Sequence, residues 1–292
     1  MKVGITGVTG LIGSALAALC QQRGHQITGF SRKAHSKLPG CNDVRLFSLE
    51  KPVDVSGLNA IIHLAGEPVI GLWTSQKRRL IVASRRESTR HLVQSMASQG
   101  PKILLCASGT GFYGNRGAEK LDETAGPGSG FLAEVSEVWE AEAKSAEEHG
   151  IRSCQLRTGM VLAKSGGAFP LLRRIFSLGL GGKMGHGQQY LPWIHLADIA
   201  ALYLHALENE TLAGPINAVA PEECTNLAFT HALGSALHRP TVFAVPEFLI
   251  RAALGDLSSI VLESQRALPK KAIESGFSFS YPTLKSAFDD LV

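Results

Sequence analysis

The chain lacks the features that would place it in a membrane or on a polyanion. Its apolar runs all fall short of the roughly 18 residues that a bilayer span needs. Its 292 residues carry 29 basic and 25 acidic side chains, which gives a net charge of only +4. Such a balance gives no sign of a nucleic-acid partner. The sequence therefore predicts a protein that binds neither a membrane nor a nucleic acid.

Cysteine is also scarce. The chain has 5 cysteines, an odd number, and no two of them have C-x-x-C spacing. This pattern excludes a disulfide framework and an ordinary zinc site, and it is typical of a reduced compartment. Glycines interrupt the first apolar run, so no signal peptide is expected. We expect a cytoplasmic protein.

Glycine, by contrast, is well placed at the start. An apolar run at Lys2–Thr6 leads into three glycines spaced three apart, and an apolar helical pattern follows at Leu11–Arg23. Such a strand, tight turn and helix can hold the pyrophosphate of a dinucleotide, although an ordinary glycine-rich turn has the same pattern. The cofactor-binding candidates in this turn are Gly7, Thr9, Gly10, Leu11, Ile12 and Gly13.

Short apolar runs alternate with helical patterns through the first half of the chain. Several runs, such as Ala60–Leu64 and Ile103–Ala107, are apolar throughout, which is typical of parallel strands buried on both faces. The pattern predicts an α/β protein with a Rossmann doubly wound parallel sheet. Further strands are expected at Gln26–Phe30, Val44–Phe47 and Ser153–Arg157, and further helices at Gln76–Ser98 and Phe131–His149.

The second half has a different composition. Residues 164–189 are rich in glycine, which favours a functional loop or lid. After it we expect a helix at Leu196–Leu207, a strand at Pro215–Val219 and then short helices broken by prolines. The sequence predicts a Rossmann domain over residues 1–163, to which residues 190–220 return. Residues 164–292 would form a smaller mixed α/β domain on the substrate side.

The end of the second strand bears on the choice of cofactor. The chain reads Ser31, Arg32 and Lys33 where an NAD site commonly has a carboxylate for the ribose. A hydroxyl and a guanidinium there suit a 2′-phosphate, because arginine binds phosphate through forked, charge-assisted hydrogen bonds. This favours NADP(H) over NAD(H). The alternative is that Arg32 is a loop cation without a role.

The end of the fourth strand reads His63-Leu64-Ala65-Gly66-Glu67. Its small residues let the backbone pass close to a flat ligand, so Leu64, Ala65 and Gly66 are cofactor-binding candidates. His63 is better explained as part of the strand's packing than as a base. Glu67 is the carboxylate beside the predicted cofactor site, which makes it a candidate for contact with substrate.

Together these and later stretches resemble the NAD-dependent epimerase/dehydratase family of extended short-chain dehydrogenase/reductases. More narrowly, they are similar to its atypical, epimerase-like subgroup. The resemblance implies bound NADP(H), with Arg85 of the Ser84-Arg85 pair and Met160 contacting the cofactor. It also implies a C-terminal domain over the nicotinamide. The stretches that carry it are Thr6–Gly13, His63–Gly66, Ala107–Gly114, Leu156–Gly159 and Pro192–Ile199.

The chain departs from this family in its catalytic residues. Members that transfer hydride use a tyrosine, a lysine four residues later and a serine or threonine at the end of the fifth strand. Here the corresponding helix contains no tyrosine, and its first lysine is Lys144. Counting from Tyr113 places the expected tyrosine and lysine near Glu134 and Val138, and the serine position reads Gly109.

A few polar residues remain as catalytic candidates. Tyr113 could act as a substitute acid, although a structural role is the simpler reading, and Glu134 could be a base or an ordinary surface carboxylate. Asp198 is expected to be a helix cap or loop tie. The catalytic candidates are Tyr113, Ser108 and Glu67, and Ser108 is also a cofactor-binding candidate.

Two functions stay open at this point. One is an NADP(H)-dependent epimerase or oxidoreductase, acting on an unknown small polar or sugar-nucleotide-like substrate with a non-standard acid/base set. The other is a non-catalytic NADP(H)-binding redox sensor or scaffold. The protein is expected to be a monomer or a homodimer, and no metal site is expected.

Overall fold

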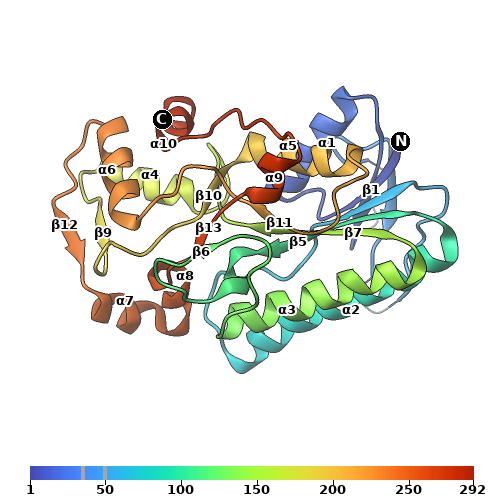
Figure 1. Ribbon diagram of the computed structural model, residues 1–292, viewed down its shortest axis with the longest axis horizontal. Coiled ribbons are helices and arrows are strands. Elements are labelled where there is room, and N and C mark those ends of the chain that lie inside the picture. Colours follow the sequence, from blue (N-terminus) through green and yellow to red (C-terminus); the bar gives the residue numbers. More distant parts are fainter. Residues whose placement is uncertain (34–36, 49–50) are drawn as a thin grey trace.

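Seven parallel strands form the central sheet of the computed structural model, which describes residues 1–33, 37–48 and 51–292 (Figure 1). The strand order is β11-β7-β5-β4-β1-β2-β3, and every neighbouring pair is parallel. The predicted Rossmann sheet is confirmed. Its strands are β1 (Lys2–Thr6), β2 (Gln26–Ser31), β3 (Asp43–Leu46), β4 (Ala60–His63), β5 (Ile103–Gly109), β7 (Arg152–Thr158) and β11 (Gly214–Ala218).

Helices cover both faces of this sheet, which explains why its central strands are apolar throughout. Helices α1 (Leu11–Gln22) and α5 (Leu196–Glu208) lie together on one face and bury a core that includes Leu16 and Leu202. Helices α2 (Ser75–Gln99) and α3 (Phe131–Lys144) cover the other face, and Trp139 belongs to that second core. Both layers are visible in Figure 1.

The strand order has a switch point at β1. From β1 the chain proceeds outward through β2 and β3 on one side, whereas β4, β5, β7 and β11 follow in order on the other side. Connections that leave in opposite directions open a crevice at the carboxyl ends of the strands, and ligands of such sheets bind there. The carboxyl ends of β1, β2, β4, β5 and β7 are therefore where a site is expected.

Residues 164–189 are more regular than a loop. They contain helix α4 (Phe169–Ser177) and strand β9 (Gly182–Met184). The helix forms because Pro170 suits a first turn and because Phe169 and Phe176, seven residues apart, are buried on one face. The reading of this segment as a long loop is thus corrected by the structure.

Short elements complete the C-terminal part and its contacts with the sheet. Strand β8 pairs with β10, β9 with β12, and β6 with β13. Sequence analysis missed most of these strands because a strand of two or three residues is too short to show an alternation of apolar and polar side chains. These elements are β6 (Lys120–Leu121), β8 (Met160–Leu162), β10 (Trp193–His195), β12 (Phe243–Val245), β13 (Arg266–Ala267), α6 (Asn226–Ala236), α7 (Glu247–Leu254), α8 (Ser259–Leu262), α9 (Lys270–Glu274) and α10 (Leu284–Leu291), with 3-10 turns η1 (Thr110–Tyr113), η2 (Ser145–His149) and η3 (Gly255–Ser258).

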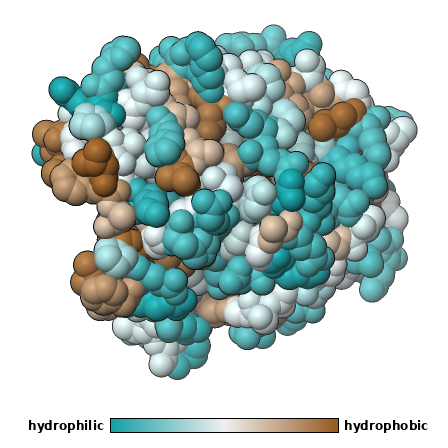
Figure 2. Space-filling model, turned by 60° about the vertical axis from the view of Figure 1, so that its left-hand side comes forward, coloured by the Kyte–Doolittle hydropathy of each residue, from teal (hydrophilic) through white to brown (hydrophobic). Residues whose placement is uncertain are grey.

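The surface is uneven in polarity. Figure 2 turns forward the side that carries α4, β12 and α7, and it shows hydrophobic side chains gathered at the left of the view. Large apolar residues of these three elements are strongly exposed, among them Leu171, Phe243 and Phe248. Among the described residues, none of the helices has the length and hydropathy that crossing a bilayer requires.

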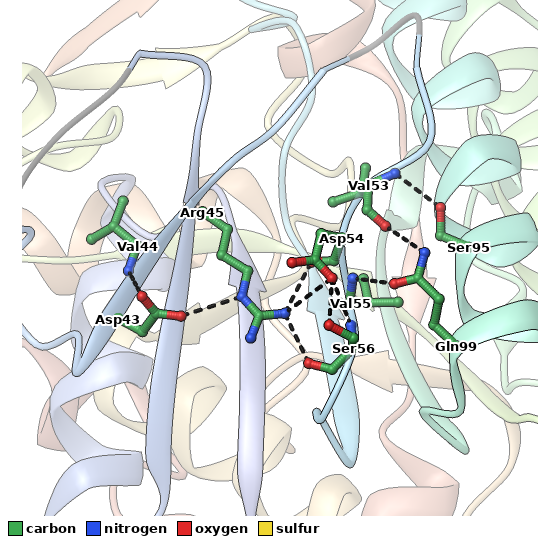
Figure 3. A network of polar contacts seen from close by, with 9 residues as sticks. All are labelled: Asp43, Val44, Arg45, Val53, Asp54, Val55, Ser56, Ser95 and Gln99. Carbon is green, nitrogen blue, oxygen red and sulfur yellow. Dashed lines mark hydrogen bonds and ion pairs between the residues drawn. The ribbon is translucent and has the colours of Figure 1, made fainter.

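A polar network fastens the edge strand β3 to the rest of the sheet (Figure 3). The Arg45 guanidinium donates to Asp43 within the strand and to the carbonyl oxygens of Asp54 and Ser56 in the segment before β4. Ser95 and Gln99 of α2 hold the same segment through the backbone of residues 53 and 55. The edge strand is thereby fixed beside β2, whose carboxyl end carries the predicted phosphate site.

Candidate cofactor and catalytic site

The glycine turn after β1 has the geometry that close approach of a ligand needs. Gly7 has a φ of +69°, which favours glycine, and its carbonyl accepts a hydrogen bond from Gly10 at 2.9 Å. A Cβ on Gly13 would collide with the Gly7 carbonyl oxygen, so only glycine lets α1 pack this closely on the turn. Gly10 caps α1 without a side-chain hydrogen bond, which leaves the first amides of the helix open to an anion.

Two cations stand at the end of β2. Arg32 and Lys33 are exposed, and neither makes an ion pair with any residue in the described ranges. The Ser31 hydroxyl accepts the amide of Lys33 at 3.2 Å, which holds the turn. Unpaired cations beside a hydroxyl fit a phosphate better than a ribose diol. The next residues of the turn, 34–36, lie outside the described residues.

Thr6 and His63 organise the end of β4 from beneath. The Thr6 hydroxyl accepts the amides of Leu64 and Ala65, each at 3.1 Å, and lies 2.7 Å from His63 Nδ1. Because that hydroxyl accepts two amides, it donates its own proton to Nδ1, so Nε2 carries the imidazole proton toward Ser88 at 3.1 Å. Complete burial lowers the pKa of His63 to about 3. The neutral imidazole therefore serves the fold, as the sequence indicated.

Arg85 lies directly against the loop that follows β4. Its Nη1 donates to the Glu67 carbonyl at 3.0 Å, its guanidinium lies over the Trp139 ring, and it approaches Gly66 so closely that a Cβ there would be 3.2 Å from Cζ. The Ser84 hydroxyl accepts the Glu67 amide at 3.0 Å. The Ser84-Arg85 pair thus shapes residues 64–67, next to the glycine turn.

Glu67 presents the accessible carboxylate of this region. Its side chain is about a third exposed, and its Oε1 accepts Lys77 Nζ at 2.5 Å. Glu67 lies in the loop between β4 and α2, and Lys77 lies at the start of α2. Of the three catalytic candidates, Glu67 is the one whose ionisable group reaches solvent.

Ser108 belongs to a buried ionic network at the end of β5. Its hydroxyl donates to Glu140 Oε1 at 2.7 Å. Arg157 of β7 donates to both oxygens of the same carboxylate at 2.8 Å, and its guanidinium stacks on Phe112. Both charged side chains are nearly inaccessible, at 4% and 12% exposed. The forked pair fixes α3 against the sheet and holds the Ser108 hydroxyl in one direction.

Tyr113 lies beneath this network. It is fully buried, its hydroxyl accepts Arg157 Nη1 at 3.0 Å, and it lies 2.7 Å from Asn217 Oδ1. Burial raises the pKa of the phenol, which opposes its ionisation. The geometry therefore favours a structural role for Tyr113 over that of a catalytic acid.

The face of α3 that meets β5 differs from the one counted along the sequence. Leu132 approaches Gly111, and Glu140 binds Ser108, so the intervening Ser136 shares their face at helical spacing. Ser136 is buried, whereas Glu134 is exposed on another face. The residues of α3 that face the end of β5 are therefore Leu132, Ser136 and Glu140, and not Glu134 and Val138 as counted from the sequence. None of the three carries a phenol or an ammonium.

Met160 opens β8, where its amide donates to the Pro192 carbonyl at 2.8 Å. Gly159 allows this close approach, because a Cβ there would be 2.7 Å from the Pro192 oxygen. The glycines at 166 and 167 lie against Leu11 at the start of α1. The segment after β7 is thus held beside the glycine turn.

Asp198 acts as a loop tie. Its carboxylate accepts the amides of Ser280 at 2.8 Å and Tyr281 at 2.9 Å, and the neighbouring His195 stacks on the Tyr281 ring. Burial raises the pKa of Asp198. These residues fasten the C-terminal segment to α5. No cluster of His, Cys, Asp and Glu in the described ranges could hold a metal ion.

Sequence reasoning missed the pairing of Glu140 with Arg157. Both residues lie in elements that the sequence predicts, but Glu140 is on a helix and Arg157 is on a strand. No spacing rule connects such positions. Helix α3 also carries Glu134, Glu137 and Glu142, so nothing in the sequence distinguishes Glu140 as the buried partner.

The fold and the site together define a class. A family described as "NAD dependent epimerase/dehydratase family" matches residues 3–219, and the chain belongs to this family. A "Domain of unknown function (DUF1731)" matches residues 245–291.

Relatives extend the likeness over the whole chain. The Bacillus subtilis "Epimerase family protein YfhF" is 34% identical, with 100% of this chain and 98% of that protein covered. The crystal structure of "human epimerase family protein SDR39U1 (isoform2) with NADPH" has a TM-score of 0.90 and 31% identity, over 100% and 99% of the two chains. The "nucleoside-diphosphate sugar epimerase from Corynebacterium glutamicum" has a TM-score of 0.81 and 32% identity, over 98% of this chain and 57% of that one.

Proposed function

We propose that the protein binds NADP(H) at the carboxyl ends of β1, β2 and β4 and uses it in an epimerase or oxidoreductase reaction on a small polar or sugar-nucleotide-like substrate. The observation that carries the cofactor is the start of α1 above the glycine turn, which has no side-chain cap, together with the cations Arg32 and Lys33, which make no ion pair within the part of the chain that the structure describes. The human relative solved with NADPH supports it.

Each part of the site has a defined task in this proposal. The open amides of α1 bind the pyrophosphate, and Arg32 with Lys33 binds the 2′-phosphate. NADP(H) supplies the hydride when bound. Residues 64–66, fixed by Thr6 and Arg85, pass their backbone along the cofactor.

Proton transfer would depend on a set other than tyrosine and lysine. Glu67 has an accessible carboxylate held by Lys77, and Ser108 has a hydroxyl held by Glu140. We assign Glu67 the acid/base role. The Ser108 hydroxyl gives its proton to Glu140, so toward a substrate it could only accept a hydrogen bond. The sugar-nucleotide-like substrate rests on the Corynebacterium glutamicum relative, which is described as a nucleoside-diphosphate sugar epimerase.

The cofactor assignment is tested by Arg32→Ala. We expect the Kd for NADPH to rise about 10- to 100-fold, because a charge-assisted phosphate contact is lost. The Kd for NADH should change by less than about threefold. Titration calorimetry measures both, with Arg23→Ala, at an exposed arginine beyond the end of α1, as the matched control. Equal weakening for the two cofactors would contradict the proposal.

The reaction is tested by turnover. Purified protein is incubated with NADPH and a broad panel of carbonyl compounds, and with NADP and a panel of sugar nucleotides. Oxidation of NADPH, reduction of NADP or epimerised product supports an enzyme. The Glu67→Gln variant should then lose most of this turnover while keeping its affinity for NADPH.

A second function is favoured by one specific observation. The α3 face toward the end of β5 carries Leu132 and Ser136 but no tyrosine or lysine, and Glu140 with Arg157 is committed to a buried ion pair. These features suit a non-catalytic NADP(H)-binding sensor or scaffold. Tight NADPH binding without turnover would support this function, and exchange of label between NADPH and solvent would argue against it.

A further inference from the structure

A short exposed connection lies against the start of α1. Residues 164–168 join β8 to α4, and each of them is exposed. Gly166 and Gly167 have φ values of +77° and +66°, and a Cβ on them would lie 3.2 and 3.3 Å from the Leu11 side chain. Glycine at both positions lets the chain pass this close to the first residue of α1. We call residues 164–168 the strap.

The backbone amides of the strap are free. Those of residues 165–168 donate no hydrogen bond to any atom in the part of the chain that the structure describes. Backbone amides of a folded chain are otherwise paired with the protein, water or a ligand. The free amides follow one another beside the start of α1, where we have proposed that the pyrophosphate of the cofactor binds.

Lys164 opens the strap and adds a cation to it. Its ammonium lies 3.6 Å from Asp290 Oδ2, beyond hydrogen-bond distance, and 62% of its side chain is exposed. A loose and solvated ion pair of this kind contributes little to stability, so it costs little to break. The ammonium is also carried on a flexible stem, which lets it turn toward another anion.

Asp290 does not depend on Lys164 as its only neighbour of opposite polarity. Its Oδ2 lies 3.5 Å from Nε2 of His195. The other ring nitrogen, Nδ1, accepts the Ala197 amide at 3.2 Å, so Nε2 carries a proton. This Nε2 is buried and makes no hydrogen bond with any described residue. When Lys164 turns away, Asp290 therefore keeps a donor within reach.

We propose that Lys164 is a further cofactor-binding residue, which turns from Asp290 to the diphosphate of NADP(H). This inference rests on the proposed function and adds the strap to its phosphate site. The amides of α1 stabilise the diphosphate as dipoles, but each phosphate carries a negative charge that they do not neutralise. Lys164 supplies a full positive charge, and the free amides of residues 165–168 supply donors beside it. Arg32 and Lys33 remain assigned to the 2′-phosphate.

The first test compares ligands with and without a diphosphate. In Lys164→Ala the Kd for NADPH and the Kd for NADH should rise by the same factor, about 10-fold, because both cofactors carry the diphosphate. The Kd for adenosine 2′-monophosphate, which has none, should change by less than about twofold. Titration calorimetry measures all three. Lys285→Ala, at an exposed lysine of α10, is the matched control and should change none of them.

Asp290→Asn separates binding by Lys164 from a structural role of the ion pair. This substitution breaks the same pair but leaves the ammonium free, so the Kd for NADPH should fall by about two- to fivefold. A rise like that in Lys164→Ala would mean that the pair acts by holding α10, and it would contradict the proposal.

Hydrogen exchange tests the strap without a substitution. The amides of residues 165–168 should exchange freely in the protein alone and several-fold more slowly with saturating NADPH, whereas adenosine 2′-monophosphate should not protect them. Affinities that Lys164→Ala leaves unchanged, or a strap that NADPH does not protect, would overturn this inference alone. Absence of NADPH and NADH binding to the unchanged protein would overturn the proposed function and this inference together.

Discussion

At the scale of single residues, His63 shows how a titratable group at a strand end is committed to the fold. Its ring nitrogens contact Thr6 and Ser88, and Thr6 in turn holds the amides of Leu64 and Ala65. Protonation would place a positive charge in a fully buried site near Arg85. The backbone beside the proposed cofactor site therefore depends on a neutral imidazole.

This arrangement predicts a pH dependence of stability. The folded pKa of His63 is lowered from 6.5 to about 3 by burial, so the unfolded chain takes up the proton first as pH falls. The neutral imidazole of His63 therefore contributes fully to the stability of the fold above pH 6.5. Below pH 6.5 this contribution declines by up to about 1.4 kcal/mol per pH unit. In urea unfolding, the His63→Gln variant should be less stable than the unchanged protein at pH 8. Its free energy of unfolding should nevertheless fall less steeply between pH 6.5 and 5.

A control separates His63 from other histidines. His149→Gln removes an exposed histidine after α3 and should leave the slope of stability against pH unchanged. An identical slope for His63→Gln and the unchanged protein would contradict the lowered pKa.

Single residues were predictable where local backbone geometry decides their role. The spacing of Gly7 and Gly13 announces a turn that only glycine allows, and the structure has this turn. The structural role of Tyr113, by contrast, does not follow from its neighbours in the sequence. Its burial depends on Asn217 and Arg157, 104 and 44 residues away in sequence, and no nearby residue announces those contacts.

At the scale of elements, α3 was predicted as a helix but with the wrong face toward the sheet. The error arises in the segment between Tyr113 and Phe131, since the geometry of such a connection cannot be read from sequence. A shift of two residues rotates a helix by about 200°. Leu132 and Ser136 therefore replace Glu134 and Val138 at the end of β5.

The ion pair that fixes α3 yields a prediction. Glu140→Ala would leave Arg157 buried without its partner and Ser108 without its acceptor. We expect a loss of about 3 to 5 kcal/mol in the free energy of unfolding, the usual cost of breaking a buried pair. Urea denaturation followed by circular dichroism measures it. Glu137→Ala, at an exposed glutamate of the same helix, should cost less than about 0.5 kcal/mol. Similar midpoints for the two variants would refute the role of the pair.

At the scale of the whole molecule, α2 and α3 contact the C-terminal part through Arg78. This side chain donates to Asp256 of η3 at 2.5 Å and lies over the rings of Trp73 and Phe131. The two rings contact each other edge to face, with centroids 4.9 Å apart. The cluster joins the starts of α2 and α3 to the segment that carries α7 and α8.

Removing this contact should loosen the C-terminal part more than it destabilises the fold. Arg78→Ala breaks a largely exposed pair, so we expect at most about 1 kcal/mol from the ion pair. Hydrogen exchange of the amides in residues 247–262 should nevertheless rise several-fold, measured by mass spectrometry. Arg86→Ala, which removes a pair within α2, is the control. Unchanged exchange in both variants would show that other contacts hold this segment.

The overall fold was the most predictable property, because apolar strands alternate with long amphipathic helices through residue 158. The C-terminal part was less predictable, since its strands are two or three residues long and pair across large sequence separations, as β6 does with β13. The division into domains at residues 163 and 164 stays a prediction. Among the described residues, β11 lies in the main sheet beside β7.

The packing of α5 on α1 has a consequence for synthesis on the ribosome. Helix α1 ends at Gln22, but the helix that covers it ends at Glu208. At usual elongation rates, roughly 10 to 40 s separate the emergence of these two segments. During that interval the apolar side of α1 has no native cover from α5, so the nascent chain presents a binding site for chaperones at its beginning until its last third has appeared.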